Sequence, residues 1–397
     1  MIQDPISGRK RERGGKTMHK KTPKRDKGKY LLILYYLLIG GLCGFLISRG
    51  TDSFSERDMS VGEHLFLMCF MLFLLYMIVI LQTIIHEAGH LVFGLLTGYR
   101  FSSFRIGSRM LLKKEGKLKF CKMSIAGTGG QCVMCPPDLI DGKMPFVLYN
   151  LGGTFMNILS VLIFAGLYFI YADIPYLSTG IKLMVVVGTG IGLINGIPMR
   201  LGMINNDGYN TICIWRSKTA MYAFWLQMKV HEKITEGVRL KDMPGEWFVV
   251  PDEDKLDNSI TSVIAVLCEN RLMDEHKFDE AVPLIDKLCS EEVATVGLHK
   301  KLLVCDRLYC ELIGDRDEEK IQSLLTKEQK AFMKHMDKFP TVIRTGYAYA
   351  LLGKKEERLA AIQKEKFETC ASSYPYESDI ESDKELLEIV DRVKEMQ

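Results

Sequence analysis

Four long apolar runs in the first half of the sequence restrict the fold of this chain more than any other feature. They lie at roughly residues 30–49, 65–98, 146–171 and 179–199. A helix that crosses a bilayer needs about 20 predominantly apolar residues. A core helix of a soluble protein can be equally apolar, but four such runs so close together are typical of a membrane protein. The sequence therefore predicts a polytopic α-helical membrane protein with about four spans.

The distribution of charge predicts how these spans are oriented. Residues 1–215 carry 24 Lys and Arg against 13 Asp and Glu, whereas residues 216–397 carry 28 against 36. Loops rich in Lys and Arg remain in the cytoplasm. The loop 100–145 has nine such residues, but the loops 50–64 and 172–178 have one and none. We therefore expect a multi-pass protein of the cell membrane with both termini in the cytoplasm.

Composition divides the chain into three parts. Residues 1–29 are predicted to form a basic, disordered cytoplasmic tail, residues 30–214 a transmembrane core, and residues 215–397 a soluble acidic helical domain. Within the core, the basic loop 100–145 alternates apolar and polar residues between glycines, including those at 127–130. This pattern predicts a short β-hairpin at the membrane surface. An irregular loop that binds anionic lipid headgroups is the alternative.

The acidic half shows apolar residues at helical spacing throughout. Apparent units begin near residues 259, 296 and 340, which is typical of stacked helices and resembles a tetratricopeptide array. The spacing of these units is irregular, so a generic helical cap is the alternative. We expect an all-α, tetratricopeptide-like domain that contacts a protein partner, and its acid excess is predicted to face the basic loop 100–145.

The cysteines carry little functional signal. Eleven are scattered over the chain without a regular framework, which predicts mostly reduced thiols. Cys132 and Cys135 form a single CxxC near Cys121, and one such pair is weak evidence for zinc or redox chemistry. Ordinary small apolar residues are the favoured interpretation. The net charge of +3 excludes a strongly basic nucleic-acid binder as a description of the whole chain, and no nucleic-acid partner is expected.

His86, Glu87 and His90 form the pattern H-E-x-x-H within the second apolar run. On a helix, positions i and i+4 share a face, so both imidazoles can bind one ion. The intervening carboxylate lies beside the open coordination position, where it can act as general base for a zinc-bound water. Ionisable residues at membrane depth are costly and are retained mainly for function. The pattern predicts one zinc ion per chain, with Glu87 as the catalytic base.

A catalytic zinc usually has three protein ligands, and the third is predicted to be Asp207. This residue follows the fourth run on the cytoplasmic side, and Gly208 would permit a turn that aims its carboxylate into the bundle. Asp138 and Asp141, in the basic loop, are the alternatives. His64 lies near the opposite end of the second run and is expected to be interfacial.

Taken together, these motifs resemble the site-2 protease family of intramembrane zinc metalloproteases. The resemblance covers roughly residues 60–212 and rests on HEAGH at 86–90, GGTFMN at 152–157, Asn-x-x-Pro at 195–198 and Asp-Gly at 207–208. It implies zinc on His86, His90 and Asp207, Glu87 as general base, Asn157 among the core polar groups, and Asn195 in contact with the substrate backbone or oxyanion.

The resemblance departs from the family pattern at one point. The interval from Asn195 to Asp207 is twelve residues, and the family has eight. This difference leaves Asn205 or Asn206 as alternatives for the role of Asn195.

The expected activity is that of a zinc-dependent intramembrane metalloendopeptidase. Its substrate would be a transmembrane protein or a membrane-bound peptide, cleaved in or near its membrane-spanning segment. The loop 100–145, if it forms a hairpin, would present an edge to an extended substrate. A non-catalytic membrane scaffold that retains the zinc site, or a peptide maturation or export factor, is the alternative.

Overall fold

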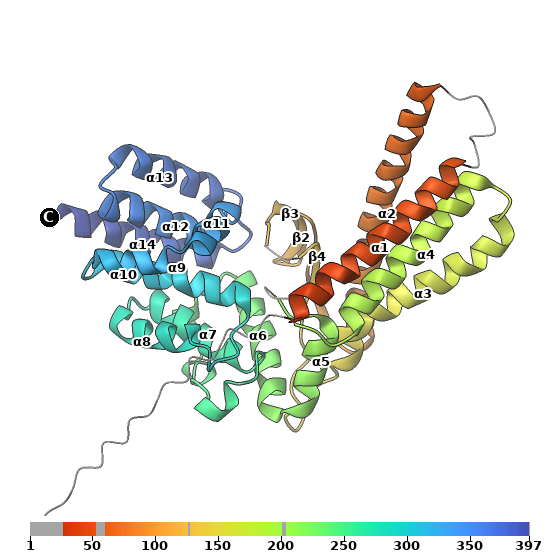
Figure 1. The fold of residues 1–397 in the computed structure, drawn as a ribbon. Coiled ribbons are helices and arrows are strands. Elements are labelled where there is room, and N and C mark those ends of the chain that lie inside the picture. Colours follow the sequence, from red (N-terminus) through yellow and green to blue (C-terminus); the bar gives the residue numbers. More distant parts are fainter. Residues whose placement is uncertain (1–26, 53–59, 126–127, 201–203, 397) are drawn as a thin grey trace, which may run out of the picture.

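The computed structural model describes residues 27–52, 60–125, 128–200 and 204–396, and these residues are mostly helical (Figure 1). Four helices are long and apolar enough to span a membrane: α1 (Lys27–Asp52), α2 (Val61–Leu96), α3 (Val147–Tyr171) and α4 (Pro175–Gly196). They coincide with the four apolar runs, so the prediction of four candidate membrane-spanning helices is confirmed. The predicted disorder of the basic tail falls, up to residue 26, outside the described residues.

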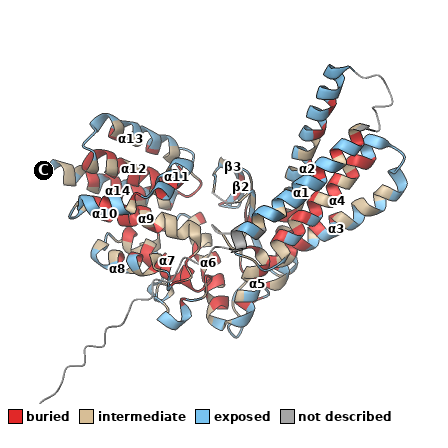
Figure 2. Cartoon of the chain, in the orientation of Figure 1, coloured by how far each residue is buried: buried red, intermediate tan, exposed pale blue. Residues whose placement is uncertain are grey.

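The limits of these helices follow from local chemistry. The helix α2 begins at a capping box, in which Ser60 Oγ accepts from the Glu63 amide and the Glu63 carboxylate accepts from the Ser60 amide. Its 36 residues extend about 54 Å, which exceeds the roughly 30 Å of a hydrocarbon core. Pro175 occupies the first turn of α4, where its missing amide hydrogen costs nothing. Many large apolar side chains on α1, α2 and α3 are exposed, as expected of surfaces that face lipid (Figure 2).

The basic loop folds into a four-stranded antiparallel sheet. Its strands are β1 (Arg100–Ile106), β2 (Arg109–Lys114), β3 (Lys117–Lys122) and β4 (Gly130–Cys135), in the order β3-β2-β1-β4. Gly107 and Gly116 have φ of 57° and 76° and form the two tight turns. The predicted hairpin is therefore present, with one strand added on each side of a β1–β2 pair. Gly127, one of the predicted turn residues, lies outside the described part of the chain.

The second half of the chain is helical. Helices α5 (Asp207–Arg216) and α6 (Lys218–Thr235) are followed by three short 3-10 turns at Leu240–Asp242, Gly245–Trp247 and Glu253–Lys255. The stacked part then comprises α7 (Ser262–Asp274), α8 (Phe278–Cys289), α9 (Gly297–Ile313), α10 (Glu318–Leu324), α11 (Lys327–His335), α12 (Pro340–Ala348), a π turn at Tyr349–Gly353, α13 (Glu357–Ala371) and α14 (Glu377–Glu395).

These helices share one apolar core, in which Ala281, Ile285, Leu308 and Tyr309 are fully buried. Helices α7, α9 and α12 begin within three residues of the units predicted near 259, 296 and 340. The all-helical prediction agrees with this architecture, and the tetratricopeptide assignment stays a prediction.

The helical domain contacts the sheet at strand β2. Tyr376, just before α14, packs against Met110 and Leu112 of β2. Beside it, Lys114 Nζ lies 2.7 Å from Glu377 Oε1. The acidic half and the basic loop therefore meet at an apolar contact flanked by an ion pair, in agreement with the predicted charge complementarity.

Candidate metal centre

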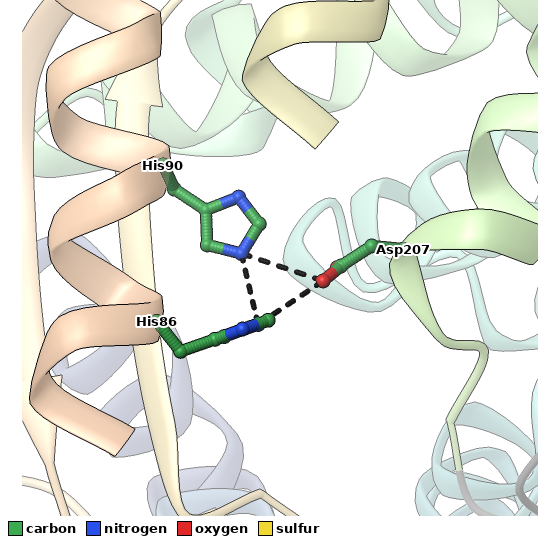
Figure 3. Close-up of side chains that lie close together, drawn as sticks. All are labelled: His86, His90 and Asp207. Carbon is green, nitrogen blue, oxygen red and sulfur yellow. Dashed lines mark hydrogen bonds and ion pairs between the residues drawn. The ribbon is translucent and has the colours of Figure 1, made fainter. Parts of the chain in front are cut away.

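Three side chains converge beside the C-terminal part of α2, as Figure 3 shows. His86 Nε2 lies 3.3 Å from His90 Nε2, and Asp207 Oδ2 lies 3.2 Å and 3.4 Å from these two atoms. Tetrahedral bonds of 2.0–2.1 Å to zinc place ligand atoms about 3.3 Å apart. His86 and His90 are 6% and 8% exposed, so water competes little for these positions. The three atoms are thus spaced as the ligands of one small ion.

The opposite nitrogens of both imidazoles are held by acceptors. His86 Nδ1 lies 2.7 Å from Asn157 Oδ1, and His90 Nδ1 lies 2.8 Å from the carbonyl oxygen of Tyr149. An amide oxygen and a carbonyl oxygen can only accept, so each Nδ1 carries the proton and each Nε2 presents a lone pair. Metal-binding histidines are almost always oriented in this way.

A network of hydrogen bonds through Gln82 fixes the orientation of the Asn157 side chain. Asn157 Nδ2 donates to Gln82 Oε1 at 3.0 Å and to the Gln82 carbonyl at 3.2 Å. Gln82 Nε2 in turn donates to Ser160 Oγ at 3.0 Å and to the Met184 carbonyl at 3.1 Å. Gln82 and Asn157 are both 0% exposed. Asn157 therefore positions the His86 ring. Gln82, which was not predicted from the sequence, in turn positions the Asn157 side chain.

Close backbone packing brings α2 and α3 together at this depth. A Cβ on Gly89 would lie 2.2 Å from the carbonyl oxygen of Gly152, and a Cβ on Gly153 would lie 2.4 Å from the His86 ring. Any side chain at these positions would push the helices apart. The absence of side chains at Gly89, Gly152 and Gly153 therefore permits close helix packing directly beside the candidate ligands.

Glu87 lies between the two histidines and contacts β4. It is 8% exposed, and a Cβ on Gly130 would lie 2.6 Å from its Oε1 atom. Arg105, which is 1% exposed, donates to the carbonyl of Gly107 at 2.7 Å and bonds to Thr128 Oγ1. These bonds tie the start of β4 to the neighbouring turn and hold Gly130 against the Glu87 carboxylate.

Asp207 is positioned by the cap of α5. Asn206 is its N-cap, and the Asn206 Oδ1 atom accepts from the amides of Tyr209 and Met199 at 2.9 Å and 3.0 Å. Burial alone would raise the pKa of Asp207, but in the metal-free chain His90 and His86, when each carries a second proton, hold this pKa below its usual range. The predicted turn at Gly208 is wrong, because this residue lies inside α5. Its lack of a side chain instead permits close approach to the Gly196 carbonyl, only 2.2 Å from a built Cβ.

The alternative third ligands lie elsewhere. Asp207 joins the histidine pair, whereas Asp138 is 91% exposed at its side chain and pairs with Lys229 Nζ at 3.5 Å. Asp141 is exposed, and His64 is exposed near the start of α2. Within the described ranges, the His86, His90 and Asp207 group is the one set of three such side chains close enough to hold a metal.

The asparagines proposed for the substrate contact differ in availability. Asn195 Nδ2 donates to the Ile191 carbonyl of its own helix at 3.0 Å. Asn205 Nδ2 donates to Ser259 Oγ at 2.8 Å. Asn206 is 2% exposed and also donates to the Ile194 carbonyl at 2.6 Å, so its amide is fully engaged. Asn206 is therefore a structural cap, and the catalytic role of Asn195 stays a prediction.

The CxxC motif lies on β4. Residues three apart on a strand point to opposite faces, so Cys132 and Cys135 are poorly arranged to share one ion. Burial raises the pKa of Cys132 well above its usual value and that of Cys135 to about 11, which keeps both as thiols. All eleven cysteines are free in the structure, and the reduced state stays a prediction.

The donor set fits a zinc ion on the chemistry of its atoms. Two neutral imidazole nitrogens and one ionised carboxylate form a three-ligand set that leaves one position open, as catalytic zinc sites do. No protein-family model matches the chain, and no curated protein or solved structure matches it either.

Proposed function

We propose that this protein is a zinc-dependent intramembrane endopeptidase. The observation that carries the proposal is the convergence of His86, His90 and Asp207 beside the Glu87 carboxylate, on a helix long and apolar enough to span a membrane. A structural metal site has no use for a carboxylate next to its open position, whereas peptide hydrolysis requires one to move a proton. The resemblance to site-2 proteases points to the same activity.

Each residue of the site has a distinct role in the proposed hydrolysis. His86, His90 and Asp207 would hold the ion, which supplies a Lewis acid that polarises the scissile carbonyl and acidifies water. Glu87 accepts a proton from the attacking water and returns it to the leaving amine nitrogen. Asn157 and the Tyr149 carbonyl keep both imidazoles in the protonation state that ligation requires. The surrounding apolar spans limit the access of bulk water to these groups.

The edge of β4 is the best placed surface for an extended substrate. Among the described strands β4 pairs with β1 alone, so its second edge is not part of the sheet ladder. On that strand the Cys132 carbonyl already accepts from Tyr149 Oη at 3.0 Å, but Gly130 lies against Glu87. A substrate strand added at Gly130–Gln131 would carry its backbone past the catalytic carboxylate. Such pairing also unwinds a helical substrate locally, which exposes the bond to be cut.

The substrate class follows from this placement. It is a transmembrane protein or membrane-bound peptide of the cell membrane, recognised through its backbone where its helix ends. The basic sheet and the acidic helical domain lie on the side where the α1 and α3 helices begin, which we propose to be cytoplasmic (Figure 1). The helical domain remains available to a protein partner.

The test is the variant Glu87→Gln in a purified, zinc-loaded preparation with a model transmembrane peptide. Cleavage should disappear while bound zinc stays at one ion per chain, because Glu87 is not among the three ligands. The matched control is Asp173→Asn, which removes an exposed carboxylate between α3 and α4 and should cleave normally. Persistent cleavage by Glu87→Gln would refute the proposed mechanism, and a metal-loaded but inactive wild type would favour a non-catalytic scaffold.

A further inference from the structure

The helix α5 lies at one end of the four candidate membrane-spanning helices (Figure 1). At its start, the N-cap Asn206 donates to the carbonyls of Ile194 and Ile197 at the end of α4. At its end, the Trp215 ring makes an edge contact with the ring of Phe146, the residue before α3, with ring centroids 6.5 Å apart. Both ends of α5 are therefore fixed at the end of the apolar bundle that we assign to the cytoplasm.

One side of α5 carries exposed apolar side chains. Trp215 is 74% exposed, and Ile212, one turn earlier, is also exposed. Leu148 in the first turn of α3 and Ile197 directly after α4 are exposed at the same end of the bundle. Tryptophan is enriched at membrane–water interfaces, because its ring is apolar and its indole N–H is polar. The position and the exposure of Trp215 are those of a side chain in such an interface.

The exposed charges on α5 and on the residues next to it in sequence are all positive. Between residues 193 and 218 they are Arg200, Arg216 and Lys218. The one acid in this stretch is Asp207, whose carboxylate faces the histidine pair. None of the three cations forms an ion pair with any residue that the structure describes. The turn before α3 adds no net charge, because it carries one exposed acid and one exposed base, Asp141 and Lys143.

Two of these cations lie on the same side of α5 as Ile212. Arg200 Nε donates to Tyr209 Oη at 2.6 Å, and the guanidinium lies 5.0 Å from the centre of the Tyr209 ring, so Arg200 is held against the helix. Burial raises the pKa of the Cys213 thiol, and the charges of Arg200 and Arg216 both act against this rise, which places both guanidinium groups near Cys213. Residues 209, 212, 213 and 216 are three or four apart and share one helix face. Cations therefore lie at both ends of an exposed apolar face.

We propose that the α5 face formed by Arg200, Ile212, Trp215, Arg216 and Lys218 binds the anionic phospholipid headgroups of the adjacent membrane leaflet. The cations pair with lipid phosphate groups, and the Trp215 and Ile212 side chains enter the boundary between headgroups and acyl chains. A zwitterionic headgroup carries a cation of its own, so it is a weaker partner for unpaired arginines. The inference requires that the four helices span a membrane, but it depends neither on zinc nor on peptide cleavage.

The test uses brominated lipids, because bromine quenches the fluorescence of a tryptophan only at short range. The full-length protein is reconstituted into vesicles of phosphatidylcholine and phosphatidylglycerol at one fixed composition. In one set of vesicles the anionic phosphatidylglycerol is brominated, and in the other set an equal amount of the phosphatidylcholine is brominated. The chain has three tryptophans, so the difference between wild type and Trp215→Phe gives the signal of Trp215. Phenylalanine keeps an aromatic ring against Phe146 in this variant.

Brominated phosphatidylglycerol should quench Trp215 more strongly than brominated phosphatidylcholine. The ratio of the two lipid association constants should be about fivefold or more, because one basic residue near an anionic surface contributes about fivefold. The combined variant Arg200→Gln, Arg216→Gln, Lys218→Gln should bring this ratio close to unity. The matched control Lys327→Gln, Lys330→Gln, Lys334→Gln removes three exposed cations from α11 and should leave the ratio unchanged.

Thermal unfolding checks that the variants fold. Arg216→Gln with Lys218→Gln breaks no ion pair of the described chain, so this double variant should fold even if loss of the Arg200–Tyr209 contact disturbs the triple variant, and it should lower the ratio in the same direction. Equal quenching by the two lipids in wild type, or a ratio that the triple and double variants retain, overturns the proposal. Equal quenching of wild type and Trp215→Phe also overturns it, because lipid then does not reach this face, and a protein occupant is favoured.

Discussion

Replacement of Asn157 by leucine tests whether the hydrogen bonds of Asn157 orient His86 for metal binding. Leucine has the same number of side-chain heavy atoms as asparagine, branched at the same position, so the change leaves no cavity at this fully buried position. It removes the 2.7 Å contact to His86 Nδ1 and the 3.0 Å contact to Gln82 Oε1. Without an acceptor at Nδ1, the neutral His86 ring is free to carry its proton on Nε2, which abolishes the lone pair that would bind the ion.

The expected magnitudes separate a metal effect from a folding effect. Hydrogen bonds between membrane helices contribute about 0.6 kcal/mol on average and at most about 1.7 kcal/mol. Loss of a residue that orients a metal-binding histidine lowers metal affinity about 10- to 100-fold, or about 1.4–2.8 kcal/mol. Asn157→Leu should therefore bind zinc about 10- to 100-fold more weakly while its metal-free thermal unfolding shifts only modestly.

The assay is competition for zinc between the purified protein and a chromophoric chelator. The matched control is Ser160→Ala, one turn away on α3. It removes one acceptor of Gln82 Nε2 but leaves the Met184 carbonyl at 3.1 Å, so zinc affinity should stay within about threefold of wild type. If Asn157→Leu and Ser160→Ala bind zinc equally, the positioning role of Asn157 is refuted.

Three further predictions follow from particular contacts. Asp207→Ala should lose bound zinc, whereas Asp138→Ala should keep it. Metal analysis of the purified proteins measures this, and the reverse result would assign the third ligand to Asp138 in the loop 100–145. Gly89→Ala should lower the free energy of unfolding by about 1–3 kcal/mol, because its Cβ would clash with the Gly152 carbonyl. The control Gly166→Ala should leave the free energy of unfolding unchanged, because the space around Gly166 is open. Equal thermal unfolding of the two variants would contradict this packing. Because the folded-state pKa of Asp379 is raised to about 7, the folded chain binds more protons than the unfolded one from about pH 4 to pH 7, and this carboxylate destabilises the fold increasingly over that window. Asp379→Asn should therefore gain stability relative to wild type as pH rises from 4 to 7 in thermal unfolding, and a constant difference would argue against the effect of burial and of the neighbouring Asp383 and Asp274 on this carboxylate.

The four candidate membrane-spanning helices and the histidine pair were predictable because each depends on local sequence. Runs of about 20 apolar residues report membrane-spanning length directly, and H-E-x-x-H places two imidazoles on one face within a single helix turn. Asp207 was predictable from its place after the fourth run. Gln82 left a weaker signal, a polar residue one turn before His86 in an otherwise apolar run.

Other features depend on contacts between distant segments. The hydrogen bond from His90 to the Tyr149 carbonyl joins residues 59 apart in sequence. Every residue has a backbone carbonyl, so the sequence does not indicate which one accepts this bond. The contact of Gly130 with Glu87 requires the whole sheet to form, with register set by strand pairing. The role of Gly208 was misjudged because a glycine that permits a turn and a glycine that permits close helix approach look identical in sequence.

The most direct test of the proposed activity follows oxygen from water into the product. A model transmembrane peptide is incubated with the zinc-loaded protein in heavy-oxygen water, and the fragments are analysed by mass spectrometry. Hydrolysis assisted by Glu87 predicts two fragments, with one heavy oxygen atom in the new carboxylate of the N-terminal fragment, for wild type and not for Glu87→Gln. Intact peptide with wild type, or the same labelled fragments with Glu87→Gln, would contradict the account.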